Sequence, residues 1–310
     1  MSKEPHWSEE IIGFREIDNH RLQELAAIER KNYSDNSVEL CAIYNAKSGK
    51  CSEDCVFCAQ SAHYRTEVMV SDIPSVDSVL SYAEMVQSYG VKHFSMVTSG
   101  KGISNKDLDR LLIIYRKLQE QTGLSLCASL GIITLEQARK LKEGGVTRYH
   151  HNLEAGEHYF PKVCTTHTFK ERVNTIKNAQ KAGMEICAGG MMGLGESIED
   201  RIELALTLKK LSVKSIPLNV LMPVKGTPMQ NNAIMTDSDF LRTIALFRYI
   251  NPDATIRFAG GRTLFNIKTQ MQSLKCGFNG MMVGNYLTRE GMEIKSDINR
   301  LEKHGFKIVQ

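Results

Sequence analysis

Cys51-Ser-Glu-Asp-Cys55-Val-Phe-Cys58 brings three thiols together in the spacing C-x3-C-x2-C. Thiolates are soft ligands that suit zinc or iron–sulfur clusters. A closed structural zinc site needs four protein ligands, usually as two separated pairs, and this loop offers three. A cubic 4Fe–4S cluster held by three thiolates keeps one iron open for a substrate. The loop therefore predicts such a cluster, with a zinc knuckle or a disulfide plus a spare thiol as alternatives.

A β-rich run leads directly into this loop, and strand-like and helix-period segments alternate after it. The expected strands are residues 38–45, 92–98, 124–130, 146–153, 184–188, 215–221, 254–259 and 280–283. The expected helices are residues 75–89, 105–121, 134–143, 169–182, 197–211, 236–249 and 262–274. Such alternation indicates a parallel sheet with right-handed crossovers. Eight units indicate an α/β fold of the closed (β/α)8 TIM type, and an open doubly wound sheet is the alternative.

The N-terminal segment precedes this pattern. Residues 5–35 are polar with spaced apolar positions, which predicts one or two helices. We expect residues 1–36 to form an N-terminal helical cap. Residues 37–310 are expected to form one barrel domain, because an α/β barrel commonly uses about 250 residues as a single domain.

Composition excludes several classes of function. The chain has 310 residues, is 42% hydrophobic and 24% charged, and carries a net charge of +4 spread among acidic residues, which does not indicate a nucleic-acid surface. The N-terminus lacks the apolar core of a signal peptide, and no apolar run approaches the roughly 20 residues that span a bilayer. We therefore expect a cytoplasmic, reducing location without membrane contact. The eight Cys are then metal ligands or small buried side chains.

Three further Cys fall inside expected strands. Cys41, Cys127 and Cys187 lie in the first, third and fifth strands, and Arg257 lies in the seventh. Inward side chains of one barrel layer come from alternate strands, so these four groups can converge on the barrel axis. The alternative is that each Cys is a small buried hydrophobe. A buried Arg would need a partner in either case.

The Cys motif with Phe57 just before its last Cys resembles the radical S-adenosylmethionine (SAM) superfamily, whose members hold a 4Fe–4S cluster and SAM. The longer run Asn45–His63 resembles the biotin synthase family, and this resemblance extends over about residues 36–300. In that family an auxiliary iron–sulfur cluster deep in the barrel supplies sulfur. Its usual ligands are three Cys and one Arg, of which two Cys match Cys127 and Cys187 and the Arg matches Arg257.

The remaining Cys of the family pattern is Ser95 in this sequence. A hydroxyl is a harder and far less acidic ligand than a thiol, so we do not assume that Ser95 binds iron. Our hypothesis is that Cys41, Cys127 and Cys187 hold the auxiliary cluster, with Arg257 adjacent or ligating. Three thiols and one open iron suit a four-iron cluster with an extra, donatable sulfide. A 2Fe–2S cluster with Cys41 or Ser95 as the missing ligand is the competing interpretation.

The resemblance also implies residues that bind SAM and substrate. Asn152 matches the polar contact to both, and Glu154 replaces the Asp that holds the ribose hydroxyls of SAM. The Gly-rich run after the fifth strand, which contains Gly193 and Glu196, resembles a turn that lies along the adenosine. Asn219 matches the contact to the cyclic urea of the substrate, which an amide suits because it donates and accepts.

The implied reaction is the radical SAM-dependent insertion of sulfur into dethiobiotin, which forms biotin. It implies a sulfurtransferase, reduced by flavodoxin or ferredoxin and loaded by iron–sulfur assembly proteins. Members of the family tend to form homodimers, and the resemblance implies the same here. Cys164 and Cys276 are not expected to be ligands. Two other functions remain open: a radical SAM barrel enzyme without sulfur insertion, and a non-catalytic iron–sulfur carrier or sensor.

Overall fold

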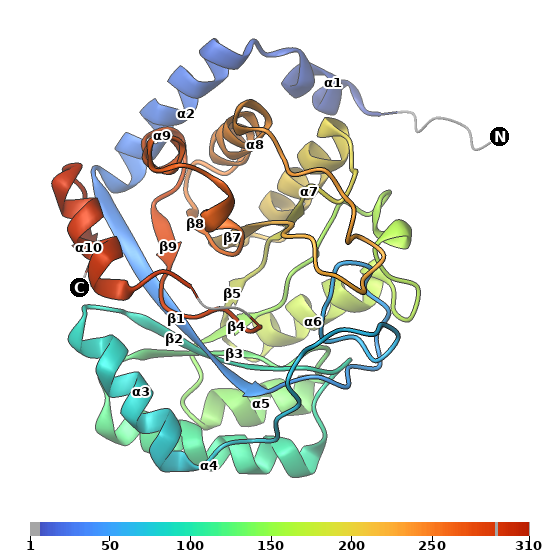
Figure 1. Ribbon diagram of the computed structural model, residues 1–310, viewed down its shortest axis with the longest axis vertical. Coiled ribbons are helices and arrows are strands. Elements are labelled where there is room, and N and C mark those ends of the chain that lie inside the picture. Colours follow the sequence, from blue (N-terminus) through green and yellow to red (C-terminus); the bar gives the residue numbers. More distant parts are fainter. Residues whose placement is uncertain (1–6, 289–290, 310) are drawn as a thin grey trace.

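A closed ring of parallel strands, surrounded by helices, forms the centre of the molecule (Figure 1). The structure is a computed structural model that describes residues 7–288 and 291–309. Its strands pair in the order β1-β2-β3-β4-β5-β7-β8-β9, and β9 pairs with β1 to close the ring. The expected (β/α)8 barrel is confirmed. The strands are β1 (Ser37–Lys47), β2 (His93–Thr98), β3 (Ser125–Ser129), β4 (Arg148–His150), β5 (Glu185–Cys187), β6 (Gly190–Met192), β7 (Ser215–Val220), β8 (Thr255–Phe258), β9 (Gly280–Met282) and β10 (Lys307–Val309).

The helices begin where the sequence supplies capping side chains. Thr134, Thr168 and Ser197 each accept a hydrogen bond from the third residue of the following helix, whose own side chain accepts one in return. These capping boxes satisfy amides that a helix leaves unpaired. The helices are α1 (Glu9–Glu16), α2 (Asn19–Ser34), α3 (Val76–Ser88), α4 (Asn105–Gln121), α5 (Leu135–Glu143), η1 (Phe160–Lys162), α6 (Phe169–Lys181), α7 (Ile198–Lys210), α8 (Asp237–Ile250), η2 (Arg262–Leu264), α9 (Ile267–Cys276) and α10 (Ile294–Lys303).

The strands carry different side chains on their two faces. Outward residues such as Phe94, Leu126 and Phe258 are almost fully buried against the helices. Each such side chain stabilises the fold by roughly 1.5–3 kcal/mol through burial. Residues of the opposite parity, including Cys127 and Arg257, line a cavity inside the barrel. The apolar core therefore lies between strands and helices, and the barrel interior holds the polar and thiol groups.

The structure differs from the sequence-based expectation at β6, at residues 262–276 and at the C-terminal elements. β6 forms within the Gly-rich run and pairs with β7. The expected helix 262–274 is instead η2 followed by α9, because the Asn266 side chain caps a new helix by accepting from Thr269 N. α10 and β10 were not predicted, and β10 pairs in parallel with the start of β1.

The two N-terminal helices lie along the outside of the barrel helices. α1 contacts α7, and α2 contacts α8 and α9 (Figure 1). Arg30 of α2 is buried, and its Nε donates to the carbonyl oxygens of Leu274 and Phe278 at 2.9 and 3.2 Å. Residues 1–6, 289–290 and 310, which fall within the expected domain limits, lie outside the described residues. Among the residues that are described, no helix has both the length and the apolar character needed to cross a membrane.

Candidate active site

A cavity of about 430 Å³ extends from the loop after β1 into the barrel. Its lining includes every thiol that the sequence put forward as a metal ligand. Three belong to the loop of residues 51–58, here called the Cys loop, and three belong to strands β1, β3 and β5. These residues are Cys51, Cys55, Cys58, Cys41, Cys127 and Cys187. The structure therefore brings both groups of thiols to one continuous space, the Cys loop at the carboxyl ends of the strands and the other group within the barrel.

Backbone hydrogen bonds fix the conformation of the Cys loop. Cys51 N donates to the Gln60 carbonyl oxygen at 2.9 Å, and Ala62 N donates to the Cys51 carbonyl oxygen at 2.7 Å. The Gln60 side chain also accepts from Ser48 Oγ and Gly49 N at 3.1 and 3.0 Å. The loop is thus tied back to the end of β1, which holds its thiols at the barrel mouth.

Cys58 and the three strand thiols are protonated near neutral pH. Burial raises the pKa of Cys58 to about 11 and that of Cys127 to about 12. It also raises the pKa values of Cys41 and Cys187, and the nearby Cys187 and Cys127 sulfurs add to the effect at Cys41. A metal must displace these protons when it binds. The soft sulfur donors form two groups, one in the Cys loop and one on strands β1, β3 and β5. This arrangement fits two iron–sulfur centres better than one closed zinc site.

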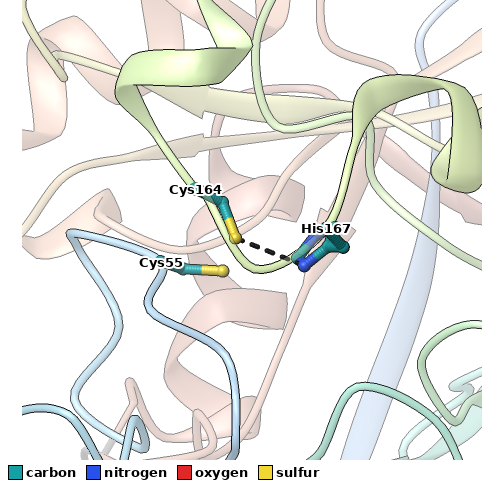
Figure 2. Close-up of side chains that lie close together, drawn as sticks. All are labelled: Cys55, Cys164 and His167. Carbon is teal, nitrogen blue, oxygen red and sulfur yellow. Dashed lines mark hydrogen bonds between the residues drawn. The ribbon is translucent and has the colours of Figure 1, made fainter.

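Cys164, which was not expected to be a ligand, lies against the Cys loop (Figure 2). Its sulfur, the Cys55 sulfur and a ring nitrogen of His167 all lie within 4.8 Å of one another. Cys164 Sγ also lies 3.1 Å from Asp54 Oδ1 and 3.2 Å from His167 Nδ1. The contact with Cys164 raises the pKa of Cys55, and burial adds to it. Cys164 is not among the residues that line the cavity, although Cys55 and His167, which it contacts, are.

A chain of side chains links the Cys loop to β4. Glu53 Oε2 lies 2.5 Å from His167 Nδ1, and Arg172 Nε donates to His167 Nε2 at 2.9 Å. Because arginine only donates, His167 Nε2 must accept, which leaves the ring proton on Nδ1 facing Glu53. Arg172 Nη1 donates in turn to the Asn152 carbonyl oxygen at 2.8 Å. The position of the Cys loop is thereby coupled to the end of the fourth strand.

Asn152 and Glu154 follow β4 and both line the cavity. Asn152 Oδ1 accepts from Gly189 N at 3.0 Å, and Asn152 Nδ2 lies 3.4 Å from Glu154 Oε2. Glu154 has a φ of 68°, a left-handed conformation that is uncommon outside glycine and is found preferentially at functional sites. Burial raises the pKa of Glu154, and the positive charge of Arg172 opposes that shift.

Of the other expected binding residues, two line the cavity and two belong to the Gly-rich turn after β6. Phe57 and Asn219 line the cavity, and Asn219 Oδ1 accepts from Gly260 N at 2.9 Å. Gly193 and Glu196 do not line it. Glu196 Oε1 accepts from Gly193 N at 2.9 Å and from Arg201 Nε at 2.7 Å, so its carboxylate shapes the Gly-rich turn.

At the base of the cavity, Ser95 and Arg257 have different surroundings. Ser95 Oγ has no hydrogen-bond partner among the described residues, and its Cα pairs with that of Cys127 across the two strands. Arg257 Nε donates to Ser215 Oγ at 3.0 Å, and its Nη2 donates to Glu39. Burial lowers the pKa of Arg257 to about 10, which leaves the guanidinium charged at neutral pH.

Several cavity residues were not identified from the sequence. His93 and Arg148 lie two residues before Ser95 and His150 on their strands, so strand parity could have shown that they point into the cavity. Glu39 does not line the cavity, but it pairs with Arg257, which does. His150 Nδ1 lies 3.4 Å from Cys187 Sγ. Cys164 was not expected to be a ligand, and His167 was not expected to contact the Cys loop. Both come from the loop before α6 and reach the Cys loop only through the fold.

Two family models match the chain. Residues 46–208 match the radical SAM superfamily, and residues 217–307 match the biotin and thiamin synthesis associated domain. The first model covers the Cys loop and strands up to β6. The second runs from within β7 to the first residue of β10 and includes α10, the helix that the sequence did not predict.

Curated relatives resemble the chain over almost its full length. A biotin synthase of Pelotomaculum thermopropionicum is 49% identical over 293 residues, which cover 94% of this chain and 91% of the relative. A biotin synthase of Acetivibrio thermocellus is 48% identical over 292 residues, with 94% and 91% coverage.

Solved structures share the fold at low sequence identity. Methylornithine synthase superimposes with a TM-score of 0.84 at 18% identity, covering 99% of this chain and 96% of that structure. The hydrogenase maturase HydG of Carboxydothermus hydrogenoformans superimposes with a TM-score of 0.83 at 17% identity, covering 96% of this chain and 74% of that structure. These likenesses support the barrel, and the identity to the curated relatives decides the family. The chain belongs to the biotin synthase family of the radical SAM superfamily.

Proposed function

We propose that this protein inserts sulfur into dethiobiotin to form biotin, using SAM and a sulfur atom from an auxiliary iron–sulfur centre. The observation that carries the proposal is the single cavity that contains the Cys loop at its mouth and Cys41, Cys127 and Cys187 within the barrel. A substrate between the two groups of thiols would be in reach of both. The membership in the biotin synthase family supports the same reaction.

Cys51, Cys55 and Cys58 would hold a 4Fe–4S cluster, with one iron free for SAM. Bound together, this cluster and SAM supply a radical that removes hydrogen from carbon, and the auxiliary centre supplies sulfur. The chain contributes the surroundings: a cavity lined by Phe57 and the Cys loop would limit the access of water and fix the reacting groups.

Asn152, Glu154 and the turn containing Gly193 and Glu196 would position SAM. Glu154 carries its carboxylate into the cavity, where it can accept two ribose hydroxyls. Glu196 would act through the turn, because both its oxygens accept from Gly193 N and Leu194 N. Asn219 would hold the cyclic urea of dethiobiotin together with Asn152.

Cys41, Cys127 and Cys187 would hold the auxiliary centre, with Arg257 beside them. We favour four irons with an extra sulfide, because three thiols leave one iron without a protein ligand. A 2Fe–2S centre that uses Cys41 or Ser95 as the additional ligand is the alternative. We further propose reduction by flavodoxin or ferredoxin, loading by iron–sulfur assembly proteins, a homodimer and a cytoplasmic location.

Anaerobic turnover of the reconstituted full chain tests this function. With SAM, dethiobiotin and reduced flavodoxin, we expect methionine, 5′-deoxyadenosine and biotin. C127A should still cleave SAM but should lose both biotin and the iron of the auxiliary centre. C276A is the matched control, because Cys276 is equally buried but lies at the end of α9 and does not line the cavity.

Three outcomes would contradict parts of the proposal. SAM cleavage without biotin would favour a radical SAM enzyme that does not insert sulfur. Absence of 5′-deoxyadenosine would favour a carrier or sensor. Mössbauer spectra and sulfide analysis that find only two irons beyond the first cluster would exclude the four-iron version.

A further inference from the structure

Two guanidinium groups lie at the base of the cavity, and they have different partners. Arg257 on β8 is the residue that the family pattern assigns to the auxiliary centre. Arg148 is the first residue of β4, and its Cα pairs with that of Cys127. Both side chains line the cavity that the strand thiols share. They therefore compete for the role of the cation next to the auxiliary centre.

Arg257 is largely occupied by protein groups. Its Nη2 donates to Glu39, and its Nε donates to Ser215 Oγ at 3.0 Å. The side chain of Glu39 is only 17% exposed, so solvent screens its negative charge weakly. This charge therefore neutralises that of Arg257 at short range. The remaining nitrogen, Nη1, is buried without a partner in the described part of the chain. A charged guanidinium offers donors and no lone pair for iron.

Arg148 is held by a carboxylate that solvent reaches. Its Nε and Nη2 donate to Glu185 Oε2 at 3.1 and 2.9 Å, and Glu185 is 69% exposed. Solvent screens this partner, so the charge of Arg148 is less fully neutralised than that of Arg257. Its Nη1 lies 3.8 Å from Glu39 Oε1. The charge of Arg148 lowers the pKa values of Cys41, Cys127 and Cys187, partly offsetting the effect of their burial.

We propose that Arg148, tethered by Glu185, is the charge-compensating residue of the auxiliary centre, and that Glu39 holds Arg257 outside the ligand set. This inference rests on the proposed auxiliary centre and specifies its surroundings. Cys41, Cys127 and Cys187 are then its only ligands among these residues, and one iron stays without a protein ligand. Arg257 contributes one hydrogen-bond donor, Nη1, in place of a metal bond.

The test uses the full chain with C51A, C55A and C58A, reconstituted anaerobically with iron and sulfide, so that only the auxiliary centre is observed. R148M and R257M are compared in this background by iron and sulfide content, by Mössbauer spectra and by midpoint potential. R257M should keep the iron, the sulfide and the spectra. R148M should lower the potential by more than R257M, because loss of a nearby cation disfavours the added electron, and R148K should restore it.

R257M also leaves Glu39 buried without its partner, so E39Q/R257M is measured beside it to keep the site neutral and folded. Loss of iron or a new Mössbauer doublet in both R257M and E39Q/R257M would overturn the inference and make Arg257 a ligand. An unchanged potential in R148M would overturn the role of Arg148. If the parent chain itself binds no iron, the auxiliary centre is absent, and the proposed function fails before this comparison is reached.

Discussion

The Nδ1 atom of His150 lies 3.4 Å from the sulfur of Cys187, and both residues are inward-facing neighbours on paired strands β4 and β5. Burial lowers the pKa of His150 to about 4, and Arg172 adds to the shift, so the ring is neutral at pH 7. This separation suits an N–H···S hydrogen bond. It also suits two ligands of one tetrahedral iron, which would be about 3.5 Å apart given typical metal–sulfur and metal–nitrogen bond lengths.

A four-iron auxiliary centre predicts the hydrogen bond, because each iron of the cube then takes a single protein ligand. We expect H150F to keep the iron content but to lower the potential of the centre, since the thiolate loses a donor. Pulsed EPR of the reduced centre should show only weak coupling to ¹⁴N. Strong coupling that disappears in H150F would instead identify His150 as a ligand of a two-iron centre.

His167 is expected to control SAM binding through Arg172. H167A removes the acceptor of Arg172 Nε and the partner of Glu53, which frees Arg172 to leave the Asn152 carbonyl. Loss of such a buried, charged hydrogen bond costs about 1.5–3 kcal/mol, so the Kd for SAM should rise about 10- to 100-fold. Equilibrium binding to the reconstituted chain measures it. H158A is the control, because His158 bonds Asp200 away from the cavity; an equal effect in both would contradict the link.

The barrel was predictable because strand and helix periodicity are local properties of the sequence. Convergence of Cys41, Cys127 and Cys187 followed from the same periodicity together with the rule that alternate strands fill one layer. β10 was missed because a strand of three residues gives little periodic signal. α10 was missed although Ile294, Ile298 and Leu301 recur at helical spacing on one face, so its sequence did carry a signal. The Gly-rich composition of 190–192 likewise hid β6, which pairs with β7 despite its lack of β-branched residues.

The partners of the site were less predictable than the thiols. Glu53 and His167 are 114 positions apart, and their contact depends on how the loop after β4 folds back onto the Cys loop. No residue pattern reports such a contact. The ion pair between Arg257 and Glu39 also escaped prediction, because the sequence showed that a buried Arg needs a partner but not which carboxylate lies two strands away.

Glu39 and Arg257 should be strongly coupled in stability. E39Q or R257M leaves one buried charge without its partner, and breaking a buried ion pair in this way costs about 3–5 kcal/mol. E39Q/R257M removes both charges and should cost much less than the two single changes together. Urea unfolding of the metal-free chain measures all three variants. Additive effects would show that the two side chains do not interact in solution.

Cys164 should be dispensable for the first cluster although it contacts Cys55 (Figure 2). Its sulfur is held by Asp54, Thr166 and His167, and it does not line the cavity. C164A is therefore expected to keep the iron content and the visible absorbance of the Cys-loop cluster, whereas C55A should lose both. Equal loss of iron in C164A would show that Cys164 is a ligand or that its packing holds Cys55 in place, and C164S, which keeps most of the packing, separates these two explanations.

Buried histidines should make the metal-free chain sensitive to mild acid. Burial lowers the pKa of His93 to about 3 and lowers that of His151 well below the ordinary value. Unfolded histidines titrate near 6.5, so below that pH the unfolded chain binds more protons than the folded chain. The free energy of unfolding therefore falls as the pH drops from about 6.5, by up to about 1.4 kcal/mol per pH unit for each such residue. Urea unfolding at pH 7.5, 6.0 and 5.0 measures the slope. H151N should reduce the slope by removing the contribution of His151.

H20N is the control and should leave the slope unchanged, because His20 is 85% exposed. A flat profile in the parent chain would mean that His93 and His151 gain protons in the folded state as readily as in the unfolded state.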